Sequence, residues 1–230
     1  MLYNSKDMLG KLYVVATPIG NFEDISLRAL EVFKEVDCLL TEDTRSANRI
    51  LMHFNLKIPV ISYHQHSGLS KKEKILSLLV GGKNLALITD AGTPGISDPG
   101  NELIDYLLTK EPSVKVVPVP GPSSLTCALS ICGFNVSKFL FLGFLPKRKK
   151  IKIYKMIQEL EVPIVYFDSP FRVIKNLQEL KSFIGEKRVC VCRELTKIHE
   201  TIYRGQINEV LDKLVQDKIR GEIVVVIEGK

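Results

Sequence analysis

The chain has 230 residues, of which 45% are hydrophobic and 25% are charged. These proportions are typical of a folded globular protein and exclude a wholly disordered one. Lys and Arg number 32 against 26 Asp and Glu, so the formal net charge is +6, which permits a polyanionic partner. The length fits one large domain or two small ones, and we favour two.

Neither a membrane span nor an export signal is indicated. The most apolar stretch is residues 139–145, whereas a helix needs about 18 to 20 apolar residues to cross a bilayer. The first ten residues carry the polar run NSKD at residues 4–7, where a secretory signal requires an apolar segment. The five cysteines include no CxxC pair, which argues against a disulfide framework or a zinc ribbon. We therefore expect a cytoplasmic protein.

Short apolar runs alternate with helical patterns along the first half of the chain. A first strand is expected at residues 11–16, followed by the turn TPIGN and a helix capped by Asp24 or Ser26. Further strands are predicted at residues 38–41, 59–62, 85–89 and 114–117. This alternation predicts an α/β domain built on a parallel sheet.

A second series of strands begins after a proline-rich stretch at residues 118–122. Three prolines in five residues cannot continue a helix or a central strand, so we place a domain boundary there, giving domains 11–120 and 121–230. Strands of the second domain are predicted at residues 139–144, 164–168, 189–192, 201–204 and 222–227. The basic run KRKKIKIYK, residues 147–155, is expected on an exposed connection.

Ligands of open parallel sheets bind beyond the carboxyl ends of the strands, so the segments that follow the strands are the candidate sites. Residues 17–21 form a turn with one glycine, and the alternative is an ordinary strand-to-helix turn. The chain contains neither GxGxxG nor GxxxxGK[ST], which argues against dinucleotide or ATP binding. Residues 41–45, TEDTR, place Glu42, Asp43 and Arg45 together directly after a strand. They form either part of a functional site or a structural ion pair or helix cap.

The segment TDAGTPGISDPG, residues 89–100, is the most specific of these signals. Its three glycines allow close backbone approach, and Asp90 and Thr93 offer polar groups, so we predict a ligand-binding loop. Ser123 or Ser124 then caps the next helix after the proline-rich stretch.

In the second domain, residues 166–172 follow a strand, and residues 193–201 gather charged side chains that alternatively form a solvated face. The histidines are scattered. His64 and His66 share a strand face but lack a third ligand, so no metal site is predicted.

Several motifs together resemble one known family. They are, in chain order, ATPIGN, DISLRAL, EDTR, DAGTPGISDPG, VPVPGPSS, GFLP, ELTK and GEIVVVIEG. The sequence resembles the tetrapyrrole methylase superfamily over residues 11–229, and within it the branch that methylates small-subunit ribosomal RNA. Members of that branch often continue in a helical C-terminal extension, whereas this sequence ends at Lys230.

The resemblance implies two αβ domains, with a mostly parallel sheet in the first and a mixed sheet in the second, and S-adenosylmethionine in the cleft between them. It implies transfer of a methyl group to the 2′-hydroxyl of a cytidine in the decoding region of 16S ribosomal RNA, or of the small subunit containing it, by a homodimer. The residues that the resemblance places at the cofactor are Pro18, Gly20, Asp90, Gly92, Thr93, Pro94, Ser97, Ser123, Ser124, Tyr166 and Glu228.

Methyl transfer from a sulfonium requires alignment of the acceptor oxygen and exclusion of water, and no metal. A ribose hydroxyl also needs a group that accepts its proton or orients its oxygen, and the candidates are Asp43, Glu194 and Lys197. Residues 147–155, with Arg45 and Arg172, are candidates for neutralising RNA phosphates. Two alternatives remain: a tetrapyrrole-like small-molecule methylase of the same superfamily and a non-catalytic RNA-binding factor.

Overall fold

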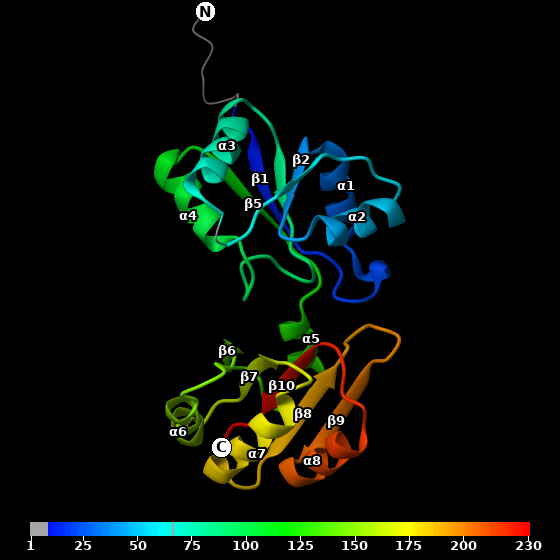
Figure 1. Cartoon of the computed structure of the whole chain (residues 1–230), viewed down its shortest axis with the longest axis vertical. Coiled ribbons are helices and arrows are strands. Elements are labelled where there is room, and N and C mark those ends of the chain that lie inside the picture. Colours follow the sequence, from blue (N-terminus) through cyan, green and yellow to red (C-terminus); the bar gives the residue numbers. More distant parts are fainter. Residues whose placement is uncertain (1–8, 66) are drawn as a thin grey trace, which may run out of the picture. The chain divides into compact units, whose positions relative to one another are not determined.

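The computed structural model describes residues 9–65 and 67–230 (Figure 1). The chain divides between Ser123 and Ser124 into two compact units, and each is described by itself.

Within the described part of the first unit, five parallel strands form a sheet in the order β3-β2-β4-β1-β5. All of them therefore end at the same edge of the sheet, as predicted for a parallel α/β domain. The elements of this unit are β1 (Lys11–Val15), the 3-10 helix η2 (Phe22–Asp24), α1 (Leu27–Glu35), β2 (Cys38–Thr41), α2 (Thr44–His53), β3 (Val60–Ser62), α3 (Leu69–Val80), β4 (Leu85–Leu87), α4 (Asn101–Lys110) and β5 (Lys115–Val119).

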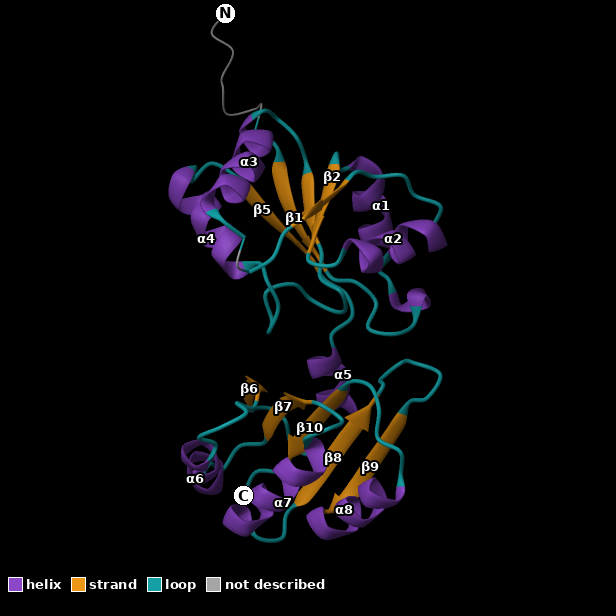
Figure 2. Ribbon diagram, viewed as in Figure 1, coloured by secondary structure: helices purple, strands orange, loops and turns teal. Residues whose placement is uncertain are grey.

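Helices cover both faces of this sheet (Figure 2). Neighbouring residues of a strand point to opposite faces, so Leu39 packs into the core beneath α1 and α2 while Leu40 packs into the core beneath α3 and α4. Strands buried on both faces must be apolar throughout, which is why their sequences read as continuous hydrophobic runs. Of the two capping residues predicted for α1, Ser26 is the one that caps it, accepting a hydrogen bond from the Ala29 amide at 3.1 Å.

Strand β5 extends beyond its predicted end at residue 117 and includes Pro118. Because β5 lies at the edge of the sheet, a proline there need not remove a hydrogen bond between strands. The opposite difference occurs at β4, which ends at Leu87 although residues 85–89 were predicted to be extended.

The second unit contains a mixed sheet in the order β6-β7-β10-β8-β9, as expected. Strands β6 and β7 are parallel, and the other neighbouring pairs are antiparallel. Its elements are α5 (Ser124–Ile131), β6 (Leu140–Phe144), α6 (Ile151–Glu159), β7 (Ile164–Asp168), α7 (Val173–Ile184), β8 (Arg188–Arg193), β9 (Thr201–Gln206), α8 (Ile207–Gln216) and β10 (Ile223–Ile227).

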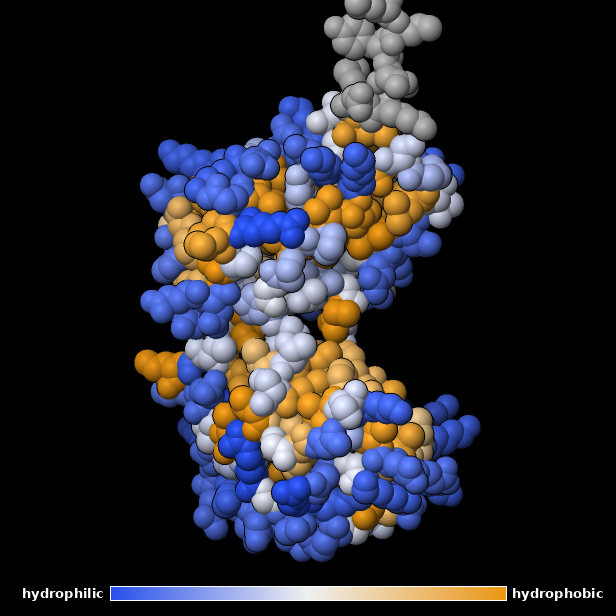
Figure 3. Space-filling model, turned by 180° about the vertical axis from the view of Figure 1, so that it is seen from behind, coloured by the Kyte–Doolittle hydropathy of each residue, from blue (hydrophilic) through white to orange (hydrophobic). Residues whose placement is uncertain are grey.

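The helices α6, α7 and α8 pack on one face of this sheet and enclose its hydrophobic core. Helix α8 shows the pattern that produces this packing, because Ile207, Val210, Leu211 and Leu214 recur at helical spacing and are all buried. On the other face, α5 packs against β10 and β7. The view from behind shows apolar side chains gathered on the second unit (Figure 3). Among the described residues, no helix is both long and apolar enough to cross a membrane.

Candidate functional site

The loops that follow β1 and β4 are joined at the carboxyl edge of the first sheet. The Thr17 amide donates to the Gly92 carbonyl at 2.9 Å, and the Gly92 amide donates to the Thr17 carbonyl at 3.0 Å. The buried Thr17 hydroxyl donates to the Thr89 carbonyl at 3.0 Å. The structure therefore brings the turn at residues 17–21 and the glycine loop at residues 89–100 together, as their positions after parallel strands predict.

Gly92 lies in a cradle formed by these loops. Its φ angle of +85° belongs to the left-handed region, which favours glycine. A side-chain carbon at Gly92 would lie 3.4 Å from Ile19 Cγ2 and 3.7 Å from the Pro122 carbonyl oxygen. The Thr93 hydroxyl donates to the same Pro122 carbonyl at 3.3 Å, which ties the proline-rich stretch to the glycine loop.

The predicted cofactor residues of the first unit differ in exposure. Pro18, Gly92 and Pro94 are buried, whereas Gly20, Asp90 and Ser97 are exposed. Thr93 and Ser123 are of intermediate exposure. At this edge the buried residues pack closely, while the Asp90 carboxylate and the Ser97 hydroxyl are exposed. Such a surface fits a polar ligand with a charged group.

The segment at residues 41–45 forms a helix cap beside the glycine loop. The Asp43 carboxylate accepts a hydrogen bond from the Arg45 amide at 2.8 Å and caps α2. The Ser46 hydroxyl donates to the Asp90 carbonyl at 3.4 Å. Partial burial raises the pKa of Asp90, and the negative charges of Asp43 and Glu42 raise it further. The Asp43 and Glu42 carboxylates therefore act electrostatically on Asp90 at this edge.

The same edge contains a histidine contact that the sequence interpretation missed. Ser62 Oγ and His64 Nε2 are 2.8 Å apart, and His64 Nδ1 lies 3.7 Å from Glu42 Oε1. The sequence does show that Glu42 follows one predicted strand and His64 follows another. It does not show that these two side chains are partners until β2 and β3 are known to be neighbours in the sheet. His66, which was considered beside His64, lies outside the described residues. Within the described ranges, no three His, Cys, Asp or Glu residues are placed to hold a metal ion.

In the second unit, the loops that follow β6, β7 and β8 lie at one edge of the sheet. Strands β6 and β7 are parallel, and β7 and β8 both run antiparallel to β10 between them, so the three end on the same side. Phe171 and Ile198, which belong to two of these loops, are each 94% exposed. This edge therefore presents apolar side chains to solvent.

Glu194 and Lys197, two of the predicted proton acceptors, form an ion pair at this edge. Lys197 Nζ lies 2.7 Å from Glu194 and 3.1 Å from Glu222. Burial alone would lower the pKa of Lys197, but these two carboxylates raise it overall. Burial alone would raise the pKa of Glu194, whereas its hydrogen bonds with Lys197 and the Glu222 amide lower it overall. Both groups are thus held in their charged forms.

Of the three predicted cofactor residues of the second unit, Ser124 begins α5 and is of intermediate exposure, and Tyr166 and Glu228 are not brought together. Tyr166 is fully buried in the core beneath the helices, so only its backbone could contact a ligand without the core opening. Glu228 follows β10, which runs opposite to β7, and therefore lies at the other edge of the sheet, where it forms an ion pair with Arg188.

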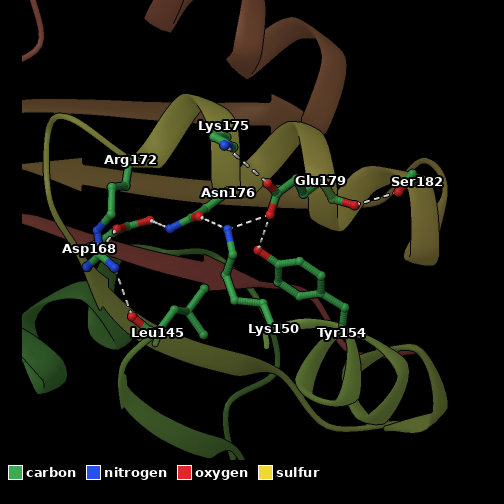
Figure 4. A network of polar contacts seen from close by, with 9 residues as sticks. All are labelled: Leu145, Lys150, Tyr154, Asp168, Arg172, Lys175, Asn176, Glu179 and Ser182. Atoms are coloured by element: carbon green, nitrogen blue, oxygen red, sulfur yellow. Dashed lines mark hydrogen bonds and ion pairs between the residues drawn. The ribbon is translucent and has the colours of Figure 1, made fainter. Parts of the chain in front are cut away.

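A polar network connects the basic segment to α7 (Figure 4). Lys150 Nζ donates to Asn176 Oδ1 at 2.6 Å and forms an ion pair with Glu179. Asn176 Nδ2 in turn donates to the buried Asp168 carboxylate at 2.7 Å. Arg172 donates to the Leu145 carbonyl at 3.0 Å and lies 3.6 Å from Asp168. Lys150 and Arg172 are therefore engaged within the unit.

The basic segment is only partly a connection. Residues 147–149 precede α6 and are exposed, whereas residues 151–155 belong to the helix. The loop at residues 147–149 is fixed on both sides. Before it, Arg172 donates to the Leu145 carbonyl, and after it, Lys150 donates to Asn176. None of Lys147, Arg148 and Lys149 forms an ion pair with a described residue, so their charges face solvent.

A parallel sheet with glycine loops at its carboxyl edge, followed by a mixed sheet, is the architecture of a class of methyl-transferring enzymes. The family model for Tetrapyrrole (Corrin/Porphyrin) Methylases matches residues 11–211, and the chain belongs to this family. The solved structure of cobalt precorrin-4 methyltransferase matches 99% of this chain and 98% of its own, with a TM-score of 0.72 and 18% identity.

Several curated relatives carry the name "Ribosomal RNA small subunit methyltransferase I". The protein from Thermotoga maritima is 41% identical over 223 residues, which are 96% of this chain and 100% of the relative. The protein from Bacillus subtilis is 38% identical over 231 residues, which are 100% of this chain and 78% of the relative.

Proposed function

We propose that this protein transfers a methyl group from S-adenosylmethionine to the 2′-hydroxyl of a cytidine in the decoding region of 16S ribosomal RNA. The observation that carries this proposal is the 41% identity, over nearly the whole chain, to a protein named as a methyltransferase of small-subunit ribosomal RNA. The choice of ribose over base, and of this cytidine, rests on the resemblance of the sequence motifs to that branch. We expect the reaction in the cytoplasm, on the small subunit or its RNA.

The joined loops of the first unit fit such a cofactor. Gly92 packs closely against Ile19 and the Pro122 carbonyl and so keeps the joined loops compact, and exposed Asp90 offers a carboxylate that can bind an ammonium or hydroxyl group. When bound, the cofactor supplies an electrophilic methyl group on a sulfonium. The proposed contacts in the first unit are Pro18, Gly20, Asp90, Gly92, Thr93, Pro94, Ser97 and Ser123.

The contacts proposed for the second unit are Ser124, Tyr166 and Glu228. Ser124 is the first residue of α5. Tyr166 would contribute through its backbone, because its side chain lies in the core. Glu228 would have to act from the opposite sheet edge, and replacing it with Gln tests a role at the cofactor while also removing the ion pair with Arg188. A cofactor affinity that is unchanged in this variant would remove Glu228 from the site.

The edge of the second unit that carries the exposed loops suits RNA. Lys147, Arg148 and Lys149 present three exposed positive charges on a loop held at both ends. Exposed Phe171 lies in a loop at the same edge and offers a surface on which an unpaired base can stack. Arg45 of the first unit is also exposed and forms no ion pair with any residue that the structure describes.

Salt dependence tests this RNA contact. Changing Lys147, Arg148 and Lys149 together to Gln should lower the slope of log affinity against log salt by about 2, at roughly 0.7 per phosphate of single-stranded RNA. The matched control changes Lys213, Lys218 and Arg220 to Gln, which removes the same charge from the same unit. Equal slopes in the two variants would show that residues 147–149 do not contact phosphate.

The activity is tested with small ribosomal subunits from cells lacking this protein and labelled S-adenosylmethionine, followed by mapping of the labelled nucleotide. Ribose label on one decoding-region cytidine is the expected result. Label on a base would contradict ribose specificity. Cofactor binding without transfer to subunits or RNA would favour a small-molecule acceptor, and absence of cofactor binding would leave only a non-catalytic role. Light scattering tests the expected homodimer.

A further inference from the structure

Three side chains at the carboxyl edge of the first sheet form a continuous chain of polar contacts. Ser62 is the last residue of β3, His64 follows two residues later, and Glu42 directly follows β2. The Ser62 hydroxyl contacts His64 Nε2 at 2.8 Å, and the Glu42 carboxylate lies 3.7 Å from His64 Nδ1. An imidazole with a carboxylate on one nitrogen and a hydroxyl on the other is arranged to accept a proton from that hydroxyl.

The fold holds this imidazole in place. Thr41 and Ser62 pair across the parallel strands β2 and β3, so the residues after them emerge side by side. Tyr63 is buried, and the backbone on its far side is fixed because the His64 amide donates to the Ser67 hydroxyl at 2.8 Å. The Ser67 amide returns a hydrogen bond to the His64 carbonyl at 2.9 Å. The histidine thus sits on an anchored turn while its side chain stays half exposed.

The histidine contact lies beside the loops proposed to hold the cofactor. Glu42 is close enough to the glycine loop for its charge to act on Asp90. Because β2 lies between β3 and β4, the order of the groups along the edge is His64, Glu42 and Asp90. Arg45, exposed at the start of α2 and three residues after Glu42, carries a positive charge that can receive a phosphate.

We propose that His64, oriented by Glu42, accepts the proton of the acceptor hydroxyl during methyl transfer, an inference that rests on the proposed function. The ribose hydroxyl takes the place that the Ser62 hydroxyl occupies at Nε2. The oxygen lone pair forms the new bond to the methyl carbon, whose bond to sulfur breaks with its electron pair remaining on sulfur. The hydroxyl proton passes to Nε2, and the resulting imidazolium is stabilised by the Glu42 carboxylate, which approaches Nδ1 more closely.

The contacts of the other candidate groups favour His64 for this step. The Asp43 carboxylate already accepts the Arg45 amide and caps α2. Lys197 is held as an ammonium by two carboxylates and has no lone pair to offer. Glu194 is bound by that ammonium and by the Glu222 amide at 2.9 Å. His64 is the side chain in this group whose second nitrogen faces a replaceable hydroxyl.

The kinetic test uses His64→Asn, Glu42→Gln and Ser62→Ala, with His53→Asn as the matched control. His53 is an exposed histidine of the same unit that stacks on Phe22. The expected result is a fall in kcat of about 10²- to 10⁴-fold for His64→Asn. Glu42→Gln should lose about tenfold, as expected for an orienting group. The control should keep kcat within about threefold, and Ser62→Ala should lose far less than His64→Asn. Cofactor affinity, measured by calorimetry, should be unchanged in His64→Asn, Ser62→Ala and the control.

A second measurement needs neither cofactor nor RNA. Nitrogen-15 NMR of the neutral imidazole in the free protein reports which ring nitrogen of His64 carries the proton. The proton is expected on Nδ1, facing Glu42, and Glu42→Gln should redistribute it toward Nε2. A wild-type proton on Nε2 would refute the orientation.

The outcomes separate this inference from the function on which it rests. Wild-type transfer to RNA that survives in His64→Asn would overturn the role of His64 and leave the methyltransferase intact. A loss in Ser62→Ala as deep as that in His64→Asn would overturn the displacement of Ser62. Wild-type enzyme that transfers no methyl group would overturn the proposed function, whatever tautomer His64 adopts.

Discussion

Replacing Lys150 with Met tests whether the polar network of the second unit stabilises the protein. The Lys150 side chain is 12% exposed, and methionine preserves much of its aliphatic packing while removing the ammonium. Asn176 is 1% exposed, and its Nδ2 already donates to Asp168, so its amide cannot turn to find another donor for Oδ1. A buried acceptor without a donor costs about 1–3 kcal/mol. The ion pair with Glu179, which is one-third exposed, adds about 0–1 kcal/mol.

The expected loss for Lys150→Met is therefore about 1–4 kcal/mol. The control is Lys152→Met in the same helix, because Lys152 is exposed and forms no ion pair with a described residue. Urea unfolding followed by circular dichroism measures the free energies of unfolding, and hydrogen exchange of peptides from α6 and α7 places the change in this unit. A difference between the two variants below about 0.5 kcal/mol would refute the reasoning.

Three further predictions concern the glycine cradle, one ion pair and the thiols. Gly92→Ala should lower the free energy of unfolding by about 1–2 kcal/mol and weaken cofactor binding measured by calorimetry. The control is Gly133→Ala, because Gly133 has a φ of +81° and no atom within 4 Å of the added carbon. It should lose similar stability and leave cofactor binding unchanged. Lys83 holds the pKa of Asp37 below its usual value, so Asp37→Asn should destabilise the protein at neutral pH. This deficit should disappear as the pH falls through that lowered pKa in pH-dependent urea unfolding. Cys127 is half-buried and the other four cysteines are buried or nearly so, so one thiol should react rapidly with a disulfide reagent, and Cys127→Ser should abolish that reaction.

Much of the fold could be predicted because burial leaves clear patterns in the sequence. Residues 38–40 and 223–227 are buried throughout and read as uninterrupted apolar runs. The meeting of the turn after β1 with the glycine loop after β4 was also predictable, since parallel strands end at one edge. Such inferences need only the direction of the strands and not their order.

Strand order and side-chain partners were the parts that sequence patterns could not supply. The contact between Glu42 and His64 depends on β2 lying beside β3, which no local pattern specifies. The burial of Tyr166 was hidden because apolar residues occupy both faces of β7, and the pattern does not say which face meets the helices. Arg172 appeared available for phosphate, but a carbonyl and a carboxylate within the unit engage its guanidinium.

The different strand directions of the two sheets suggest a division of roles between the units. In the parallel sheet, every strand delivers its following loop to one edge, so Thr17, Glu42, His64 and Asp90 gather without long connections. In the mixed sheet, β10 runs against β7 and β8, which sends Glu228 to the opposite edge and leaves the loops with Lys147 and Phe171 on the other. Chemistry that requires several converging polar groups is therefore best supported by the first unit. An exposed edge with positive charge and an aromatic ring is suited to binding the RNA chain. We therefore expect substitutions that lower kcat to cluster in the first unit, and substitutions that change the salt dependence of RNA affinity to cluster in the second.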